Sequence, residues 1–144
     1  MIAVDTNILL RYLLRDDKQQ AEKAAHLING DERVLITDVV LAEMIWTLGG
    51  RKYQLKKEDI VNTIESLFKE PNLHFEDDQV VWRALQAYRG AEPVKVGKRK
   101  KEADFADALI AYKAQSIATK QQARLQAVYT FDKAASQLPH NRMP

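Results

Sequence analysis

Five acidic residues occupy positions from which carboxylates could act on a ligand: Asp5, Glu43, Asp104, Asp107 and Asp132. Carboxylates that converge in one pocket repel each other, at a cost on the order of 3 kcal/mol for two charges about 5 Å apart at an effective dielectric constant near 20. A divalent cation removes that cost, and a set of oxygen ligands favours Mg²⁺ or Mn²⁺ over zinc. The chain has no cysteine, and its three histidines share no ligand spacing. The residue types therefore indicate a magnesium or manganese site.

Two of these acids follow short apolar runs. Asp5 ends the run 2–4, which predicts a buried strand in the middle of a parallel sheet, and Asp132 ends the run 127–131. Parallel strands end at the same edge of a sheet, where open α/β folds bind their ligands. The two carboxylates are therefore expected at one edge, although each Asp could do no more than cap the helix that follows it.

Glu43 lies in a predicted helix that is otherwise apolar. It is the only charged residue between Val39 and Gly50, and Trp46 lies three residues further on. An ionised glutamate that is buried without a partner costs several kcal/mol. We therefore favour a metal ion or a basic group as its partner. The alternative is a narrow polar stripe that faces water.

Asp104 and Asp107 lie three residues apart in a predicted helix. This spacing puts both carboxylates on one face of its first turn. Two interpretations remain open for the pair. The side chains could belong to a functional site, or Asp104 could cap the helix while Asp107 complements the helix dipole.

Short strands alternate with helices along the chain. Strands are predicted at residues 2–4, 33–36, 73–75 and 127–131, and helices at residues 8–14, 18–28, 38–48, 58–68, 78–89 and 104–118. A short helix is expected after Asp132, followed by a loose C-terminus. The lysine-rich stretch 91–101 contains Pro and Gly and is predicted to be a loop. This alternation favours an α/β fold with a parallel sheet.

The bulk properties fit one domain, residues 1–144, with an ordinary composition of 46% apolar and 29% charged residues. No apolar run approaches the roughly 18 residues that a membrane span needs. Asp5 interrupts the first apolar segment too early for a signal peptide. We therefore expect a cytoplasmic protein. The net charge of +2 does not by itself indicate a nucleic-acid partner.

Taken together, these segments resemble the PIN domain and, more narrowly, the VapC-type toxins of bacterial toxin–antitoxin pairs. The motifs that carry the resemblance are Asp5-Thr6-Asn7, the apolar helix with Glu43, the segment ADFADALIAY and Thr130-Phe131-Asp132. They occur in the right order and span nearly the whole chain. The DFADAL stretch is fairly specific, whereas a DTN triplet alone is commonplace. One departure is Glu102-Ala103, where similar proteins often have glycine.

The resemblance implies a PIN-like three-layer α/β/α sandwich with a mostly parallel central sheet, and metal-dependent cleavage of RNA with Mg²⁺ or Mn²⁺. The acidic quartet of the family, expected to bind the metal, matches Asp5, Glu43, Asp107 and Asp132. Asp104 is the extra acid of members with the DFADAL form. Asn7 and Thr130 match the small polar residues that accompany the quartet.

Basic residues crowd the stretch before the acidic helix: Lys95, Lys98, Arg99, Lys100 and Lys101. A charge run of this kind is often only a solvated surface. Beside an acidic metal site it would offset phosphate repulsion and hold an RNA backbone, with little sequence information.

Two predicted helices carry more apolar residues than one buried face requires. This surplus of apolar residues predicts an exposed groove that accepts an amphipathic partner helix, lined by Leu9, Leu10, Leu13 and Trp46. The alternative is that these residues pack in the core. The resemblance implies that this partner is a cognate antitoxin, and homodimerisation is also expected. The chain shows no DNA-reading module, so operator binding is expected of the antitoxin and not of this chain. No membrane partner is expected.

Two competing interpretations remain. A receiver-like regulatory domain also binds Mg²⁺ with acids at strand ends, but it has no use for Glu43 and expects paired acids near the first strand, which are absent here. A non-catalytic RNA-binding protein could keep the fold without the chemistry, and the intact acidic set speaks against it.

Overall fold

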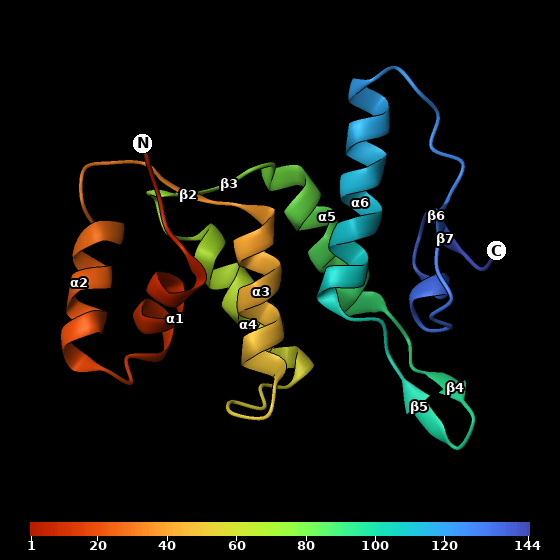
Figure 1. Cartoon of the computed structure of the whole chain (residues 1–144), viewed down its shortest axis with the longest axis horizontal. Helices are drawn as coiled ribbons and strands as arrows, with labels where there is room; N and C mark the ends of the chain where they lie inside the picture. The colour runs from red at the N-terminus through yellow and green to blue at the C-terminus, as the bar shows by residue number, and fades with distance from the viewer. The chain divides into compact units, whose positions relative to one another are not determined.

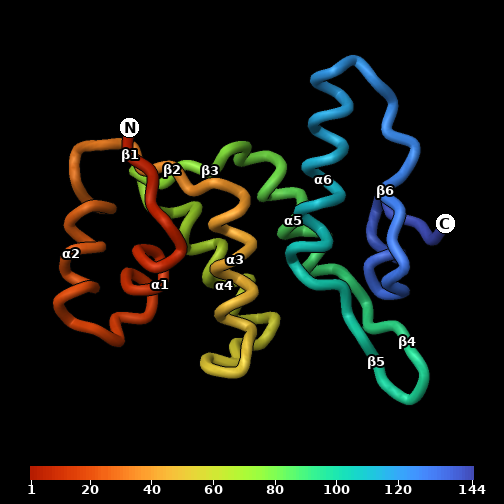
Figure 2. The backbone as a smooth tube through the Cα atoms, in the orientation of Figure 1, coloured from red at the N-terminus to blue at the C-terminus, as the bar shows by residue number.

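The computed structural model describes residues 1–144 and divides into two compact units, Met1–Asp78 and Gln79–Pro144. Figures 1 and 2 show the course of the chain through each unit. The prediction that residues 1–144 form a single domain stays a prediction. No helix combines the length and the apolar character needed to cross a membrane.

The first unit contains a parallel three-stranded sheet and four helices. Its elements are β1 (Ile2–Ala3), α1 (Thr6–Leu14), α2 (Lys18–Ile28), β2 (Val34–Ile36), α3 (Asp38–Gly49), α4 (Lys57–Phe68) and β3 (Leu73–Phe75). The strand order is β1-β2-β3, with Ala3 paired to Leu35 and Leu35 paired to His74. The predicted α/β class with a parallel sheet is confirmed.

The prediction that the first strand is the middle of the sheet is wrong for this three-stranded sheet. β1 lies at its edge and β2 at its centre. Val34 and Ile36 of β2 are fully buried, whereas Ala3 of β1 is exposed. A run of three apolar residues fits either position, so the sequence pattern alone could not separate a central strand from an edge strand.

Side-chain caps explain where three helices of this unit begin. Asp5, Asp17 and Thr37 precede α1, α2 and α3, and the side-chain oxygen of each accepts a hydrogen bond from the amide three residues further on. Each cap satisfies an amide that the helix itself leaves unpaired. The predicted starts of these helices are therefore within two residues of the observed ones.

The second unit is built on two helices, a hairpin and a short strand pair. Its elements are α5 (Asp78–Gly90), β4 (Val94–Val96), β5 (Arg99–Lys101), α6 (Phe105–Lys120), β6 (Val128–Tyr129), the 3-10 helix η1 (Ala135–Gln137) and β7 (Asn141–Arg142). Phe105 is fully buried and packs edge-on against Tyr88, with ring centroids 6.0 Å apart. This contact joins the start of α6 to α5 and fixes the turn that carries the acidic residues.

Two expectations for this unit are corrected. Residues 91–101 are not a loop, because β4 and β5 form an antiparallel hairpin in which Val96 pairs with Arg99. Gly97, with φ +61°, occupies the first position of its two-residue turn, where glycine relieves the strain of a positive φ. The C-terminus is not loose, because β7 pairs in parallel with β6.

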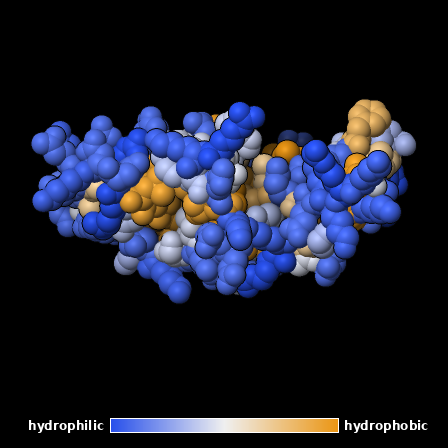
Figure 3. Space-filling model, turned by 90° about the horizontal axis from the view of Figure 1, so that it is seen from below, coloured by the Kyte–Doolittle hydropathy of each residue, from blue (hydrophilic) through white to orange (hydrophobic).

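Most of the face drawn in Figure 3 is hydrophilic, with apolar residues gathered in a few patches. The side chains that form the cores are almost entirely aliphatic or aromatic, and Thr6 is the one buried polar residue of the described chain. Polar and charged side chains, including the acidic residues of interest, therefore lie at or near the surface of their units.

Candidate functional site

Asp5 lies at the end of β1 and caps α1. Its Oδ1 accepts a hydrogen bond of 3.0 Å from the amide of Ile8, so the capping interpretation holds for one oxygen. The side chain is exposed, and Asp5 and Asn7 line one pocket together with Arg11. A cap occupies one carboxylate oxygen, so it leaves the other free to bind a ligand.

Glu43 lies on the exposed face of α3. The side chains of Val39 and Trp46 on that face are 73% and 79% exposed, whereas Met44 and Leu48 are buried. The expectation that Glu43 is buried is therefore wrong, whereas a metal ion or basic group as its partner stays a prediction. The apolar composition of the helix is explained by an exposed apolar stripe, which a count of hydrophobic residues does not distinguish from a buried one.

Asp104 and Asp107 form a reciprocal capping box at the start of α6. The amide of Asp107 donates to Asp104 Oδ1 at 2.8 Å, and the amide of Asp104 donates to Asp107 Oδ2 at 3.0 Å. Burial raises the pKa of Asp107 to about 6, and the negative charges of Asp104 and Asp132 add to the rise, although the hydrogen bond from the Asp104 amide opposes it. The capping interpretation is confirmed, and Asp107 also lies within the electrostatic reach of other acids.

Asp132 is held from three sides. Its amide donates to Thr130 Oγ1 at 3.0 Å, and its Oδ1 accepts from the amide of Ala135 at 3.0 Å. Its Oδ2 accepts from Lys101 Nζ at 2.6 Å, and this ion pair holds the pKa of Asp132 below its usual range. Thr130, expected to be a supporting residue, thus positions the backbone of Asp132.

We refer to Asp104, Asp107 and Asp132 as the acidic cluster. Lys101 is the positively charged group that faces this cluster. Asp132 raises the pKa of Lys101 most, and the charges of Asp107 and Asp104 add to it. The structure brings these four residues into electrostatic contact within the second unit. Asp5, Asn7 and Glu43 belong to the first unit.

The donor chemistry of the acidic cluster fits a hard divalent cation. All three side chains offer carboxylate oxygens, and the charges of Asp104 and Asp132 add to the rise that burial causes in the pKa of Asp107. No three Asp, Glu, His or Cys side chains converge closely enough in the structure to hold an ion together. The predicted ligand set of Asp5, Glu43, Asp107 and Asp132 therefore stays a prediction.

The basic residues of the predicted RNA surface lie on the β4–β5 hairpin, and all of them are exposed: Lys95, Lys98, Arg99, Lys100 and Lys101. Lys95 is paired directly with Lys100 across the hairpin. Like charges in that position repel each other, so an anion bound between them would stabilise the hairpin. Lys101 differs from the others because its ammonium group is engaged by Asp132.

The predicted partner groove is only partly available. Leu9 and Leu10 are 0% and 5% exposed and belong to the core of the first unit, so they cannot line an exposed groove. They are buried because α1 packs against both α2 and α3. Leu13 is half-buried, and Trp46 is exposed as expected.

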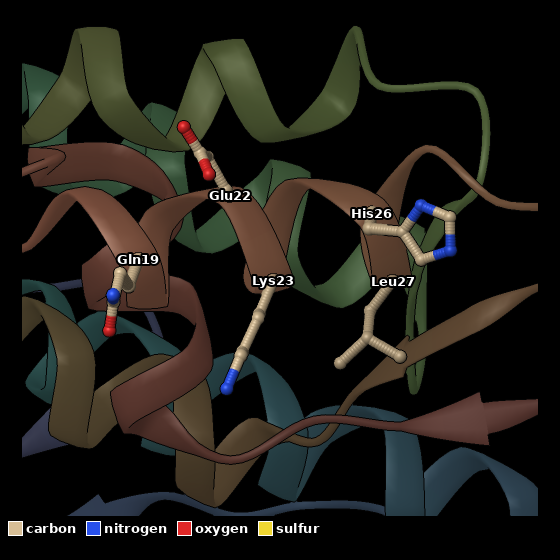
Figure 4. A pocket seen from close by; sticks show the side chains of 5 residues that line it. All are labelled: Gln19, Glu22, Lys23, His26 and Leu27. Carbon is tan, nitrogen blue, oxygen red and sulfur yellow. The ribbon is translucent and has the colours of Figure 1, made fainter.

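A hollow along α2 contains none of the predicted site residues. Figure 4 shows that five side chains of this one helix line it: Gln19, Glu22, Lys23, His26 and Leu27. His26, one of the three histidines that share no ligand spacing, lies in this exposed hollow.

Sequence reasoning missed the aromatic and guanidinium groups around β6. Phe131 is 85% exposed and directly precedes Asp132. Arg142 lies over the ring of Tyr129, with Cζ 5.1 Å from the ring centroid. The alternation of Tyr129 and Phe131 was the available signal, but it was interpreted only as part of a strand.

Comparison with known proteins identifies the class to which this fold and these acidic residues belong. The model of the PIN domain matches residues 2–141, and the chain belongs to the PIN-domain family. The family and the PIN-like α/β/α fold class predicted from the motifs are confirmed. The matched range contains all five acidic residues.

Among solved structures, this chain is similar to the VapC20 toxin of Mycobacterium tuberculosis, which is described as a toxin that cleaves the sarcin–ricin loop. The two sequences are 17% identical. The match covers 94% of this chain and 93% of that chain, with a TM-score of 0.40. No curated protein matches the chain.

Proposed function

We propose that the protein is a metal-dependent endoribonuclease that hydrolyses RNA phosphodiester bonds and acts as the toxin of a type II toxin–antitoxin pair. The observation that carries this proposal is the acidic cluster at the start of α6 and after β6, inside a chain that matches the PIN domain. The cluster combines oxygen ligands for a divalent cation with Lys101, a basic group that can meet a phosphate.

The chemistry requires a nucleophile near neutral pH and neutralisation of the charge that builds up at phosphorus. A bound Mg²⁺ or Mn²⁺ supplies both, because it lowers the pKa of bound water and neutralises phosphate oxygens. In this proposal Asp5 and Asp107 hold the ion, directly or through water. Glu43 and Asp132 orient its waters or hold a second ion, and Asp104 keeps the first turn of α6 in place through the capping box.

The proposed partners follow from the same assignment. We propose an RNA substrate, a cognate antitoxin and a homodimer, in the cytoplasm. The exposed stripe of α3, formed by Val39, Glu43 and Trp46, supports a protein partner, since it leaves two large apolar side chains in water.

Purified wild-type protein incubated with mixed cellular RNA tests the proposed activity. Cleavage with Mg²⁺ or Mn²⁺ and none with chelator is expected, together with growth arrest when the protein is expressed. Tight RNA binding without cleavage under any metal condition would favour the non-catalytic alternative. A stable aspartyl phosphate formed from a small phosphodonor would favour the receiver-like alternative.

Because the pKa of Asp107 is raised, the stability of the fold is expected to fall with rising pH, whereas the affinity for metal is expected to rise. A carboxyl group whose pKa rises from 3.8 to about 6 on folding stabilises the fold at low pH, and that contribution is lost as the pH rises through about 4 to 6. Without metal, the wild type is therefore expected to lose melting temperature relative to Asp107→Asn across this range. Asp104, Asp132 and Lys101 are the charged groups nearby and are present in both proteins.

Mn²⁺ should bind the wild type more weakly as the pH falls below about 6, because protonation of Asp107 removes a ligand. Thermal unfolding with chelator and Mn²⁺ titration over pH 5–7.5 measure the two effects. A constant difference in melting temperature between the two proteins from pH 4 to 7 would contradict the pKa assignment.

Charge reversal on the hairpin is expected to weaken RNA binding in a salt-dependent way. Replacing Lys95 and Lys100 by Glu removes two cations that lie side by side. If each contacts one phosphate of a single strand, the slope of log K against log salt falls by about 0.7 per contact. Fluorescence anisotropy with chelated, uncleaved RNA at several salt concentrations measures this slope. The double replacement of Lys18 and Lys23 by Glu, an equal charge change on α2, is the control, and equal slopes for all three proteins would rule out the proposed contact.

A further inference from the structure

The acidic cluster does not explain why the apolar ring of Phe131 is exposed to solvent. Its side chain is 85% exposed, and Tyr129 two positions earlier is 55% exposed. The amide of Val128 donates to the carbonyl oxygen of His140 at 2.7 Å, and that of Thr130 donates to Arg142 at 3.1 Å, so the segment is extended. Phe131 follows this paired segment at a bend, where its ring stands out into solvent.

Phe131 is presented on a firmly held backbone. On one side, Thr130 is fixed by its backbone bond to Arg142 and by the bond that its Oγ1 accepts from the amide of Asp132. On the other side, the Asp132 carboxylate is held by Ala135 and Lys101. A ring held in this way loses little conformational freedom when a flat ligand binds to it.

A cationic group adjoins the ring of Tyr129, and a second contacts the residue that follows Phe131. Arg142 lies over Tyr129 and donates from Nη2 to its hydroxyl at 2.6 Å. Lys101 donates to Asp132, the residue next to Phe131. Aromatic faces beside guanidinium and ammonium groups are the combination that binds unpaired nucleotides, because the rings stack on bases while the cations meet phosphates.

We propose that Phe131 is a base-stacking platform for an unpaired nucleotide of the RNA, with Tyr129 and Arg142 as the adjoining position. This inference rests on the proposed ribonuclease function and narrows its substrate to single-stranded segments. Paired bases are already stacked and cannot use this position.

Binding of a short single-stranded RNA that carries 2-aminopurine, measured with chelator so that nothing is cleaved, tests the proposal. Stacking on Phe131 should quench the fluorescence of the base. Phe131→Leu, which keeps an apolar side chain without a ring, is expected to weaken binding by about 5-fold to 100-fold and to abolish the quenching. Phe131→Trp should retain both. Trp82→Leu, which removes an aromatic side chain exposed to 47% on α5, is the matched control and should change neither.

Equal affinity and equal quenching for the wild type and Phe131→Leu would overturn the inference while leaving the ribonuclease function intact, provided that the wild type cleaves RNA when metal is restored. A wild type that neither binds nor cleaves RNA would overturn both. A change of oligomeric state in Phe131→Leu without a change in RNA binding would assign the ring to a protein interface and also overturn the inference.

Discussion

Asp107→Asn is expected to lower the rate of RNA cleavage on the order of 10³-fold, because a neutral amide replaces the carboxylate that we propose as a principal metal ligand. The substitution is nearly isosteric. The amide oxygen of Asn can still accept the hydrogen bond that the Asp104 backbone donates to Asp107 Oδ2, so α6 keeps its first turn. Single-turnover cleavage with saturating Mn²⁺ measures the loss, and circular dichroism confirms that the variant is folded.

The chain contains a matched control for this substitution. Asp59 occupies the same third position of α4, where its Oδ2 accepts from the amide of the N-cap residue Lys56 at 3.3 Å, as Asp107 accepts from the amide of Asp104. Asp59→Asn therefore makes the same chemical change at an equivalent helix position. It should leave cleavage unchanged, whereas an equal loss in both variants would show that the capping box, and not metal binding, explains the effect.

Asp5→Asn is expected to produce the second large loss of cleavage, again on the order of 10²-fold or more. Asp5 has two roles in our account, since its Oδ1 caps α1 and its carboxylate charge is proposed to hold the metal. Asparagine caps helices about as well as aspartate, so the substitution removes the charge and retains the cap. The same cleavage assay should therefore show lost activity with an unchanged melting temperature.

Asp17→Asn is the control that separates these two roles. Asp17 caps α2 with the same geometry, accepting from the amide of Gln20 at 3.0 Å, and no functional role is proposed for it. Full activity in both variants would assign Asp5 to capping alone. Lost activity in Asp5→Asn alone would support the metal role.

The order and type of the longer elements could be predicted from the sequence because local signals determine them. The helix starts follow capping residues such as Asp17 and Thr37, and the strand Leu73–Phe75 was predicted with its observed bounds. The hairpin at 94–101 was missed because lysine and arginine dominate its composition and it follows a proline. Its structure depends on cross-strand pairing around Gly97, which composition does not reveal.

The residue types of the candidate site could be predicted from the sequence, whereas only some of its side-chain contacts could. The spacing of Asp104 and Asp107 predicted their shared face, and the structure shows the reciprocal hydrogen bonds. The ion pair of Lys101 with Asp132 could not be predicted, because it joins residues 31 positions apart through the fold. The burial of Glu43 was predicted wrongly, since an apolar helix can leave an apolar face in water.

The exposure of Phe131 likewise could not be predicted from the sequence. Sequence patterns indicate which residues are apolar, but burial depends on what packs against them. Phe105 and Phe131 are both phenylalanines next to a proposed site acid, yet one is fully buried and the other is 85% exposed. This difference is visible only in the folded chain, and it carries the proposed stacking role.

The central claim is that Asp5, Glu43, Asp107 and Asp132 serve a metal centre. Paramagnetic broadening of backbone NMR signals by substoichiometric Mn²⁺ tests it most directly. We expect the NMR signals of the amides of Asn7, Met44, Asp107 and Asp132 to broaden together at the same Mn²⁺ concentration. Asp107→Asn is expected to weaken the broadening at all four. An absence of broadening at Asp107 and Asp132, or at Asn7 and Met44, would contradict it.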